Sequence, residues 1–387
     1  MAGKLFSKKD KSNKPILPFF NTGKMDIVFV VILVILLGIG LVMLFSASYV
    51  YAYNKFGDSF KFIKQQLVFA IVGLLFMYLF SRIDYHIYKK IAWPVYGGIV
   101  ILLGVMLLLP PMISGVNYKR WIVIGPINFQ PSEIAKFAIV LLFAYLIEKY
   151  QSKMQTFWFG YVLFLGLLGV ICALVVAEPH LSATVLIFLI GITLMFVGGI
   201  RKRYLFASAG ALGGLGAIAI FTGIVGYGLD RFNYWLDPWS DAQGKGFQTI
   251  QSLLAIGSGG FLGRGLGQSR QKYLWVPEPH NDFIFSIVCE ELGFIGAMII
   301  VALFCLLVWR GFTIAIRAKD KFGSLLAIGL TFQVGLQALL NILVVTNTIP
   351  NTGISLPFFS YGGTSMLILL SEMGIVLSVS RSARMPK

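Results

Sequence analysis

Long apolar runs alternate with short polar segments along almost the entire chain. Ten of these runs come close to the roughly 20 residues that a helix needs to cross a bilayer. They span residues 26–48, 63–81, 91–110, 132–148, 158–177, 182–200, 203–225, 282–309, 323–346 and 361–380. The first run is too long for the apolar core of a signal peptide, so we expect an uncleaved span. The pattern predicts an all-α polytopic membrane protein with about ten transmembrane helices.

The polar segments divide the chain into a tail, one membrane domain and one large loop. Residues 1–24 are polar and basic, and they are predicted to form a disordered cytoplasmic tail. Residues 25–387 are predicted to form a single transmembrane domain. Within it, the one long polar interval covers residues 226–281, between the seventh and eighth predicted helices. This loop is therefore the first place to look for a reaction site.

Composition supports a membrane protein and argues against a soluble one. Hydrophobic residues make up 57% of the chain, charged residues 12%, and the mean hydropathy is +0.83. Soluble domains carry about 25% charged residues, so this chain could not cover a soluble core with polar surface. The net charge of +16 comes from basic clusters between apolar runs. We attribute the charge to membrane topology and expect no nucleic-acid partner.

The distribution of basic residues predicts the orientation of the spans. If the N-terminus is cytoplasmic, 21 of the 32 Lys and Arg residues fall in cytoplasmic segments and ten in outer segments. This bias favours ten spans with both termini in the cytoplasm. It also places four outer segments on one side of the membrane, namely residues 111–131, 177–181, 226–281 and 347–360.

Neither a cofactor site nor a nucleotide site is indicated. Cys172, Cys289 and Cys305 all lie in apolar runs without the spacing of a metal site. No GxxxxGK[ST] pattern occurs in the chain, so chemistry driven by ATP is not expected. A divalent cation stays open, although no ligand spacing points to one.

Asp282 is the strongest catalytic candidate, and two interpretations of it stay open. It follows Glu278 and His280 where the eighth apolar run begins, and His280 is itself a candidate for substrate binding. Asn281 or Asp282 could simply cap this helix, because both residue types are favoured at that position. Alternatively, a carboxylate at the membrane surface has its pKa raised by burial and can act as a general base.

Several basic residues could bind an anionic substrate. Lys119 and Arg120 precede Trp121 in an outer segment, and Arg120 suits bidentate contact with a phosphate. Trp121 could equally be an interfacial anchor. In the large loop, a glycine-rich stretch carries Arg264, Arg270 and Lys272. These three could bind phosphate, or they could belong to a solvated basic loop near lipid headgroups.

Charged residues inside the spans are costly and suggest function. Glu133 and Lys136 lie three residues apart on one helix face, as a structural ion pair or as substrate-facing groups. Glu290 and Glu291 are adjacent, so we expect at most one of them to face a given cavity. The polar residues Gln333, Gln337 and Asn341 are expected to bond between helices. The outer segment 347–360 is expected to be irregular and to line a wet cavity.

Taken together, several long motifs, in their order along the chain, resemble the SEDS family. This is a family of bacterial polytopic membrane proteins that act in shape, elongation, division and sporulation. The matching stretches include RWIVIGPINFQPSEIAK, AEPHLSAT, GLGQSRQK, PEPHNDFIFSIVCEELGFIGA and PNTGISLPFFSYGGTS. GLGQSRQK and LDPW are more similar to the FtsW and SpoVE branch than to the RodA branch. His180 stands where many members carry Asp, and Asn281 stands where Thr is usual.

The resemblance implies a peptidoglycan glycosyltransferase in the bacterial cytoplasmic (inner) membrane. Its substrate would be lipid II, a disaccharide-pentapeptide on undecaprenyl pyrophosphate, and a class B penicillin-binding protein would be its partner. The family's candidate catalytic carboxylate falls on Asp282, and its functional Trp falls on Trp121. The implied linkage is β-1,4 with inversion.

Two other functions stay open at this stage. Polar residues in spans and a broken outer segment would also suit a flippase for a lipid-linked substrate. Alternatively, the chain could serve as a scaffold for a penicillin-binding protein. The process served, whether division, elongation or sporulation, is not decided by the sequence.

Overall fold

A computed structural model describes residues 23–109, 120–124, 127–204, 206–207, 210, 234–244, 246–273, 275 and 277–383. The predicted tail at 1–24 lies almost wholly outside these residues, as does most of the predicted span at 203–225. Lys119, a candidate phosphate ligand, also lies outside them.

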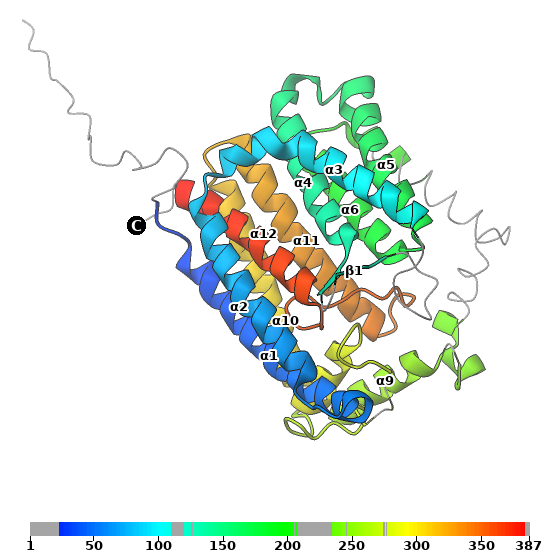
Figure 1. The fold of residues 1–387 in the computed structure, drawn as a ribbon. Helices are drawn as coiled ribbons and strands as arrows, with labels where there is room; N and C mark the ends of the chain where they lie inside the picture. Colours follow the sequence, from blue (N-terminus) through cyan, green and yellow to red (C-terminus); the bar gives the residue numbers. More distant parts are fainter. Residues whose placement is uncertain are drawn as a thin grey trace, which may run out of the picture.

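The described chain is built almost entirely of helices (Figure 1). The long helices are α1 (Ile27–Phe56), α2 (Lys61–Arg82), α3 (Tyr88–Leu108), α4 (Pro131–Lys149), α5 (Leu163–Ala177), α6 (Leu181–Gly198), α9 (Phe247–Gly259), α10 (Ile284–Ile316), α11 (Lys321–Val345) and α12 (Gly363–Ser382). A short antiparallel hairpin joins β1 (Ile122–Ile124) to β2 (Ile127–Phe129), with Ile122 opposite Phe129. The hairpin was not predicted from the sequence pattern.

Eight of the described helices are long and apolar enough to cross a membrane. Helix α4 is of similar length but carries Glu133, Lys136, Glu148 and Lys149. It occupies the middle of the bundle and packs against α3, α6 and α11 (Figure 1). The prediction of an all-α polytopic membrane protein is confirmed.

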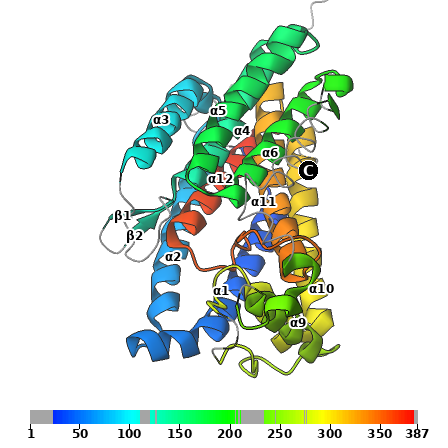
Figure 2. The ribbon, with the colours of Figure 1, turned by 90° about the vertical axis from the view of Figure 1, so that its right-hand side faces the viewer.

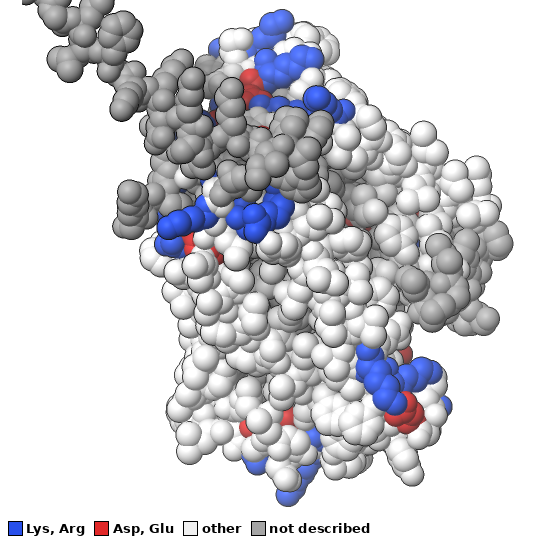
Figure 3. Space-filling view, turned by 60° about the vertical axis from the view of Figure 1, so that its left-hand side comes forward, with Lys and Arg blue, Asp and Glu red and all other residues white. Residues whose placement is uncertain are grey.

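The surface agrees with this architecture. Figure 3 shows Lys and Arg gathered toward the two ends of the molecule, with a broad band of uncharged residues between them. Such a band is expected where lipid chains contact protein, because charged side chains are costly there. The chain is therefore an integral membrane protein.

Two groups of helices enclose the site. In Figures 1 and 2, α1, α2, α10 and α12 lie together, while α3, α5 and α6 lie on the other side of α4 and α11. Helices α2 and α12 approach so closely that a side-chain carbon at Gly374 would lie 2.5 Å from the carbonyl oxygen of Met77. The hairpin, α9 and the segment before α12 gather at one end of the bundle (Figure 2).

Candidate functional site

A cavity of roughly 740 Å³ lies at this end of the bundle, between the two groups of helices. Segments far apart in the sequence contribute its walls: the end of α1, the β-hairpin, the turn before α6, the segment before α10 and the segment before α12. The residues predicted to form a site that line it are Arg120, Trp121, Glu133, Lys136 and Asp282. The fold thus brings together candidates from two parts of the chain that are far apart in the sequence.

Asp282 lies in the cavity wall with its carboxylate unused by the helix that follows. Helix α10 begins at Ile284, its N-cap is Phe283, and no side chain caps it within the described chain. The interpretation of Asn281 or Asp282 as a cap is therefore wrong. The backbone carbonyl of Asp282 accepts a hydrogen bond of 2.7 Å from Asn341 Nδ2, which fixes the position of the residue.

The surroundings of Asp282 favour its protonated form more than water would. Burial, together with the neighbouring Glu278 carboxylate, raises the pKa of Asp282 to about 6, while Arg120 opposes both effects. Glu278 also lines the cavity and is held by Asn281 Nδ2 at 2.9 Å. A carboxyl group with a pKa near 6 is basic enough to accept a proton and still largely ionised at neutral pH.

Cationic side chains border the same cavity. Arg120 donates to the backbone carbonyl of Glu178 at 3.3 Å and to that of Pro179. Lys55, at the end of α1, lines the cavity and donates to Tyr51 Oη at 2.9 Å. Both can meet an anionic group that enters the cavity.

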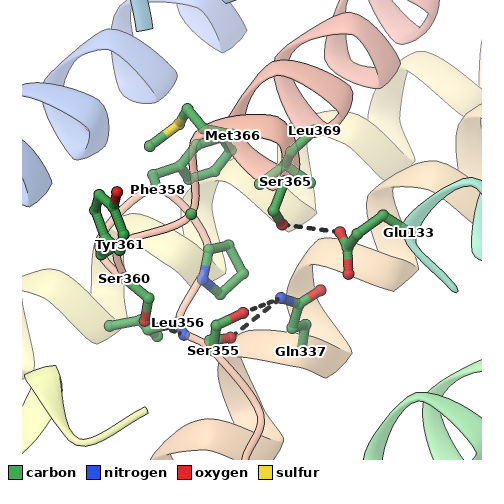
Figure 4. A pocket seen from close by; sticks show the side chains of 12 residues that line it. Glu133, Gln337, Ser355, Leu356, Phe358, Ser360, Tyr361, Ser365, Met366 and Leu369 are labelled. Atoms are coloured by element: carbon green, nitrogen blue, oxygen red, sulfur yellow. Dashed lines mark hydrogen bonds between the residues drawn. The ribbon is translucent and has the colours of Figure 1, made fainter. Parts of the chain in front are cut away.

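The floor of the cavity is a hydrogen-bonded polar network between helices. Lys136 Nζ lies 2.9 Å from Glu133 Oε1 and donates to Gln337 Oε1 at 3.0 Å. Ser365 donates to the other Glu133 oxygen at 2.9 Å, and Gln337 donates to the carbonyl of Ser355 at 3.1 Å (Figure 4). Glu133 and Lys136 thus form the predicted ion pair and also line the cavity, while contact of either residue with a substrate stays a prediction.

The segment before α12 is irregular and lines the cavity, as predicted. Gly353 has a φ of 73°, and a side chain there would begin 3.2 Å from a carboxylate oxygen of Asp282. Asn341 Nδ2 binds the carbonyl of Ile354 at 2.6 Å. The polar residues of α11, Gln333, Gln337 and Asn341, therefore form hydrogen bonds to neighbouring segments. Gln337 additionally lines the cavity.

The turn before α6 supplies His180 to the cavity wall. Its ring lies 3.4 Å from Ser132 Oγ and within 3.3 Å of Gln130 Nε2. Burial, with Arg120 and Lys136, lowers the pKa of His180 to about 3, so the ring is neutral. Burial raises the pKa of the adjacent Glu178 to about 7, although Arg120 opposes this.

Four residues predicted to bind substrate lie outside the cavity lining: His280, Arg264, Arg270 and Lys272. His280 is buried among aromatic rings, with its centroid 4.3 Å from that of Phe62. Burial lowers its pKa to about 4. Lys272 is fully buried in an ion pair with Glu291 at 2.8 Å. Arg264 lies 3.8 Å from Glu290, and Arg270 is exposed elsewhere on the loop.

Other cavity residues were missed by sequence analysis. In the sequence, Lys55 contributed only to the prediction of membrane orientation, as one of the basic residues in a predicted outer segment. Tyr361, Thr364 and Ser365 belong to the SYGG stretch, whose sequence predicted irregular backbone but no particular contact. In the described residues, no group of three or more His, Cys, Asp or Glu side chains could hold a metal ion.

Comparison with known proteins gives a consistent result. The family FTSW_RODA_SPOVE, described as "Cell cycle protein", matches residues 27–385. The chain is 41% identical to the "Probable peptidoglycan glycosyltransferase FtsW" of Geobacter sp. (strain M18), covering 93% of this chain and 97% of that protein. It is also 41% identical to "Stage V sporulation protein E" of Bacillus subtilis (strain 168), covering 93% and 98%.

Solved structures share the fold. A chain from work on "Structural coordination of polymerization and crosslinking by a peptidoglycan synthase complex" matches with a TM-score of 0.77 and 30% identity, covering 92% of this chain and 98% of that one. The Rod shape determining protein RodA of Thermus thermophilus matches with a TM-score of 0.69 and 26% identity, covering 94% and 98%.

Proposed function

Because this chain belongs to the FtsW/RodA/SpoVE family, we propose that it is a peptidoglycan glycosyltransferase that polymerises lipid II into glycan strands during cell division or sporulation. Its relatives carry the names of a peptidoglycan glycosyltransferase and a sporulation protein. The observation that carries the proposal is the partly buried Asp282, which caps no helix and lies in a cavity bordered by Arg120 and Lys55.

In the proposed reaction, Asp282 acts as the general base. Its carboxylate takes the proton from the 4-hydroxyl of the acceptor sugar as that oxygen bonds to the anomeric carbon of the donor. The bond between this carbon and the phosphate oxygen breaks, and the pyrophosphate leaves with the electron pair. No nucleotide is needed, because departure of the pyrophosphate makes the transfer favourable.

The remaining groups hold the substrate and offset developing charge. Arg120 and Lys55 stabilise the leaving pyrophosphate, and such preorganised cations act most strongly where water is excluded. Trp121 offers an apolar and hydrogen-bonding surface to a sugar ring. Glu133, Lys136 and Gln337 present polar atoms at the floor for sugar hydroxyls or amides.

A divalent cation is a further part of this proposal. Such an ion would be held mainly by the substrate phosphates, with Glu278 as a carboxylate ligand beside them, and these are donors that Mg²⁺ prefers. Such an ion would neutralise charge on the leaving group, while every step above is carried by side chains. Chelation with EDTA that leaves the rate unchanged would exclude it.

The setting of the reaction follows from the same premise. We place the protein in the bacterial cytoplasmic (inner) membrane, with both termini in the cytoplasm and the cavity on the outer side. The bias of basic residues toward cytoplasmic segments supports this orientation. A class B penicillin-binding protein is the proposed partner, because one structural relative comes from a complex described as coordinating polymerization and crosslinking.

The decisive experiment is a polymerisation assay with purified lipid II, using wild type and Asp282→Ala, with and without the penicillin-binding partner. Wild type should form glycan chains and Asp282→Ala should not. Normal polymerisation by Asp282→Ala would exclude the general base. Lipid II movement across vesicles without any glycan product would instead favour a flippase, and no product even with the partner would favour a scaffold.

A further inference from the structure

The outer part of α10 is a separate short helix whose two ends are held by different parts of the molecule. Gly293 interrupts α10 with a φ of 68° and a ψ of −171°. The segment Ile284–Leu292, which directly follows Asp282, is therefore not continued in register by the remainder of α10. Its position must be set by contacts other than the helix itself.

The glycine-rich part of the large loop inserts into this interruption. The carbonyls of Glu290 and Glu291 accept hydrogen bonds of 3.0 Å from the backbone N–H groups of Arg264 and Gly265. Beyond the interruption, Phe294 N–H donates to the carbonyl of Gly260 at 2.9 Å. The glycine-rich stretch therefore satisfies backbone groups that a continuous helix would have paired internally.

Glu290 and Glu291 both bind the next part of the loop, and neither lines the cavity around Asp282. Glu290 accepts from Arg270 N–H at 2.9 Å and from the hydroxyl of Ser269. Glu291 lies 2.8 Å from Lys272 Nζ, and both side chains are 0% exposed. The helix ends just after these residues, so both carboxylates reach the loop.

Helix α1 completes this cluster. We call the cluster the clasp, and it consists of Ser46, Ser269, Lys272, Glu290 and Glu291. Ser46 Oγ lies 2.7 Å from each carboxylate oxygen of Glu291 and 3.2 Å from Lys272 Nζ. A buried ion pair costs desolvation energy and is tolerated only with such complete hydrogen bonding. The clasp thus fixes the inner end of the short helix to α1 and to the loop.

The opposite end of the short helix is fixed beside the cavity. Asn341 binds the carbonyl of Asp282, Ser360 Oγ donates to the carbonyl of Asn281 at 2.7 Å, and Tyr361 N–H donates to that of His280 at 2.9 Å. Nine residues of helix span about 13 Å, so this one short helix connects the clasp directly to the segment that carries Asp282.

We propose that Lys272 and Glu291 are positioning residues for the transfer reaction, which set the depth of Asp282 in the cavity through the short helix Ile284–Leu292. This inference rests on the proposed role of Asp282. It assigns to Lys272 a function other than phosphate binding, and it gives the glycine-rich loop the task of holding the base rather than the substrate.

The test is Lys272→Met in the full-length protein, with purified lipid II. We expect kcat to fall by about 10-fold to 100-fold, because a displacement of 1 Å from remote changes can cost that much, while KM changes less than about twofold. The pH midpoint of the acid limb of kcat should also change, because the pKa of Asp282 depends on its burial and on its distance from Glu278. Lys272→Arg should restore most of the rate.

A matched control exists at the other end of the same two helices. Arg310 of α10 lies 2.8 Å from Asp26, the N-cap of α1, so Arg310→Met removes an ion pair that also joins α1 to α10. We expect it to leave kcat and the pH midpoint unchanged. An equal loss in both variants would show that the clasp acts only through general packing, and the inference would be wrong.

Two further outcomes keep the inference separate from the proposed function. If Lys272→Met does not fold, Ser46→Ala removes one partner of Glu291 without leaving a charge unpaired, and it should lower kcat by a few-fold. Unchanged kcat and pH midpoint in folded Lys272→Met or in Ser46→Ala would overturn the positioning role. Full activity of Asp282→Ala measured in parallel would instead overturn the proposed base.

Discussion

The cavity and the clasp lie at opposite ends of one short helix, and their charged residues have different surroundings. In the clasp, Glu291 and Lys272 are fully buried and use their charges on each other and on Ser46. In the cavity, Asp282 is half-buried, caps no helix and lies beside another carboxylate, Glu278. This difference distinguishes Lys272 and Glu291, whose charges stabilise the fold, from Asp282, whose carboxylate is available for a reaction.

The strongest test of this comparison is Asp282→Asn. We expect activity to fall by about 10²-fold to 10⁴-fold, the usual contribution of a general base. The melting temperature should stay the same or rise, because burial of the carboxylate is unfavourable. Activity in the lipid II assay and thermal unfolding in detergent measure the two effects. A strongly destabilised Asp282→Asn protein would place Asp282 with the structural charges.

Arg120 should have the next largest effect. Removal of its guanidinium in Arg120→Ala should lower kcat/KM on the order of 10²-fold, the typical loss for one preorganised group facing transition-state charge. Arg120→Lys keeps the charge but loses the planar fork, so it should recover only part of the rate. Equal rates for Arg120→Ala and wild type would remove Arg120 from the leaving-group site.

The glycine-rich loop offers a test on the clasp side. Gly263 has a φ of 80°, and a side-chain carbon there would lie 2.2 Å from the carbonyl oxygen of Glu291. Gly263→Ala should therefore cost about 1–3 kcal/mol of stability. Gly257→Ala is the control, because its added carbon meets nothing within 4 Å. Thermal unfolding that affects both variants equally would contradict the tight insertion.

The smallest expected effect concerns pH. Glu278→Gln removes a negative charge that raises the pKa of Asp282. The ionised base then persists to lower pH, so the acid limb of kcat/KM, which reports the free enzyme, should move downward from its midpoint near pH 6 by less than about one unit. A pH series in the lipid II assay measures the shift. An upward movement would show that Glu278 acts through some other contact.

Much of the fold could be predicted from the chain because apolar runs of helical length depend only on local sequence. The boundaries were less predictable: α1 continues to Phe56, beyond its apolar run, through a polar and aromatic stretch. The interruption of α10 gave no local signal, because a single glycine inside an apolar run is also compatible with a continuous helix. It depends on a loop that begins more than 20 residues earlier.

The site was predictable only in part, for a related reason. Arg120, Trp121 and Asp282 stood out as polar or aromatic residues in outer segments. Whether Asp282 caps a helix depends on where α10 begins, a matter of two residues that sequence patterns do not resolve. Lys272 looked like a phosphate ligand because its buried partners, Glu291 and Ser46, are 19 and 226 positions away.

The size of the cavity has a consequence for how a polymer could grow in it. A volume of roughly 740 Å³ is within the range of sites for small molecules, which is about 300–1,000 Å³. It holds a few sugar rings and not a strand. Under the proposed function, each newly extended end must slide out before the next unit enters. We therefore expect translocation, rather than bond formation, to limit the rate of a well-supplied enzyme.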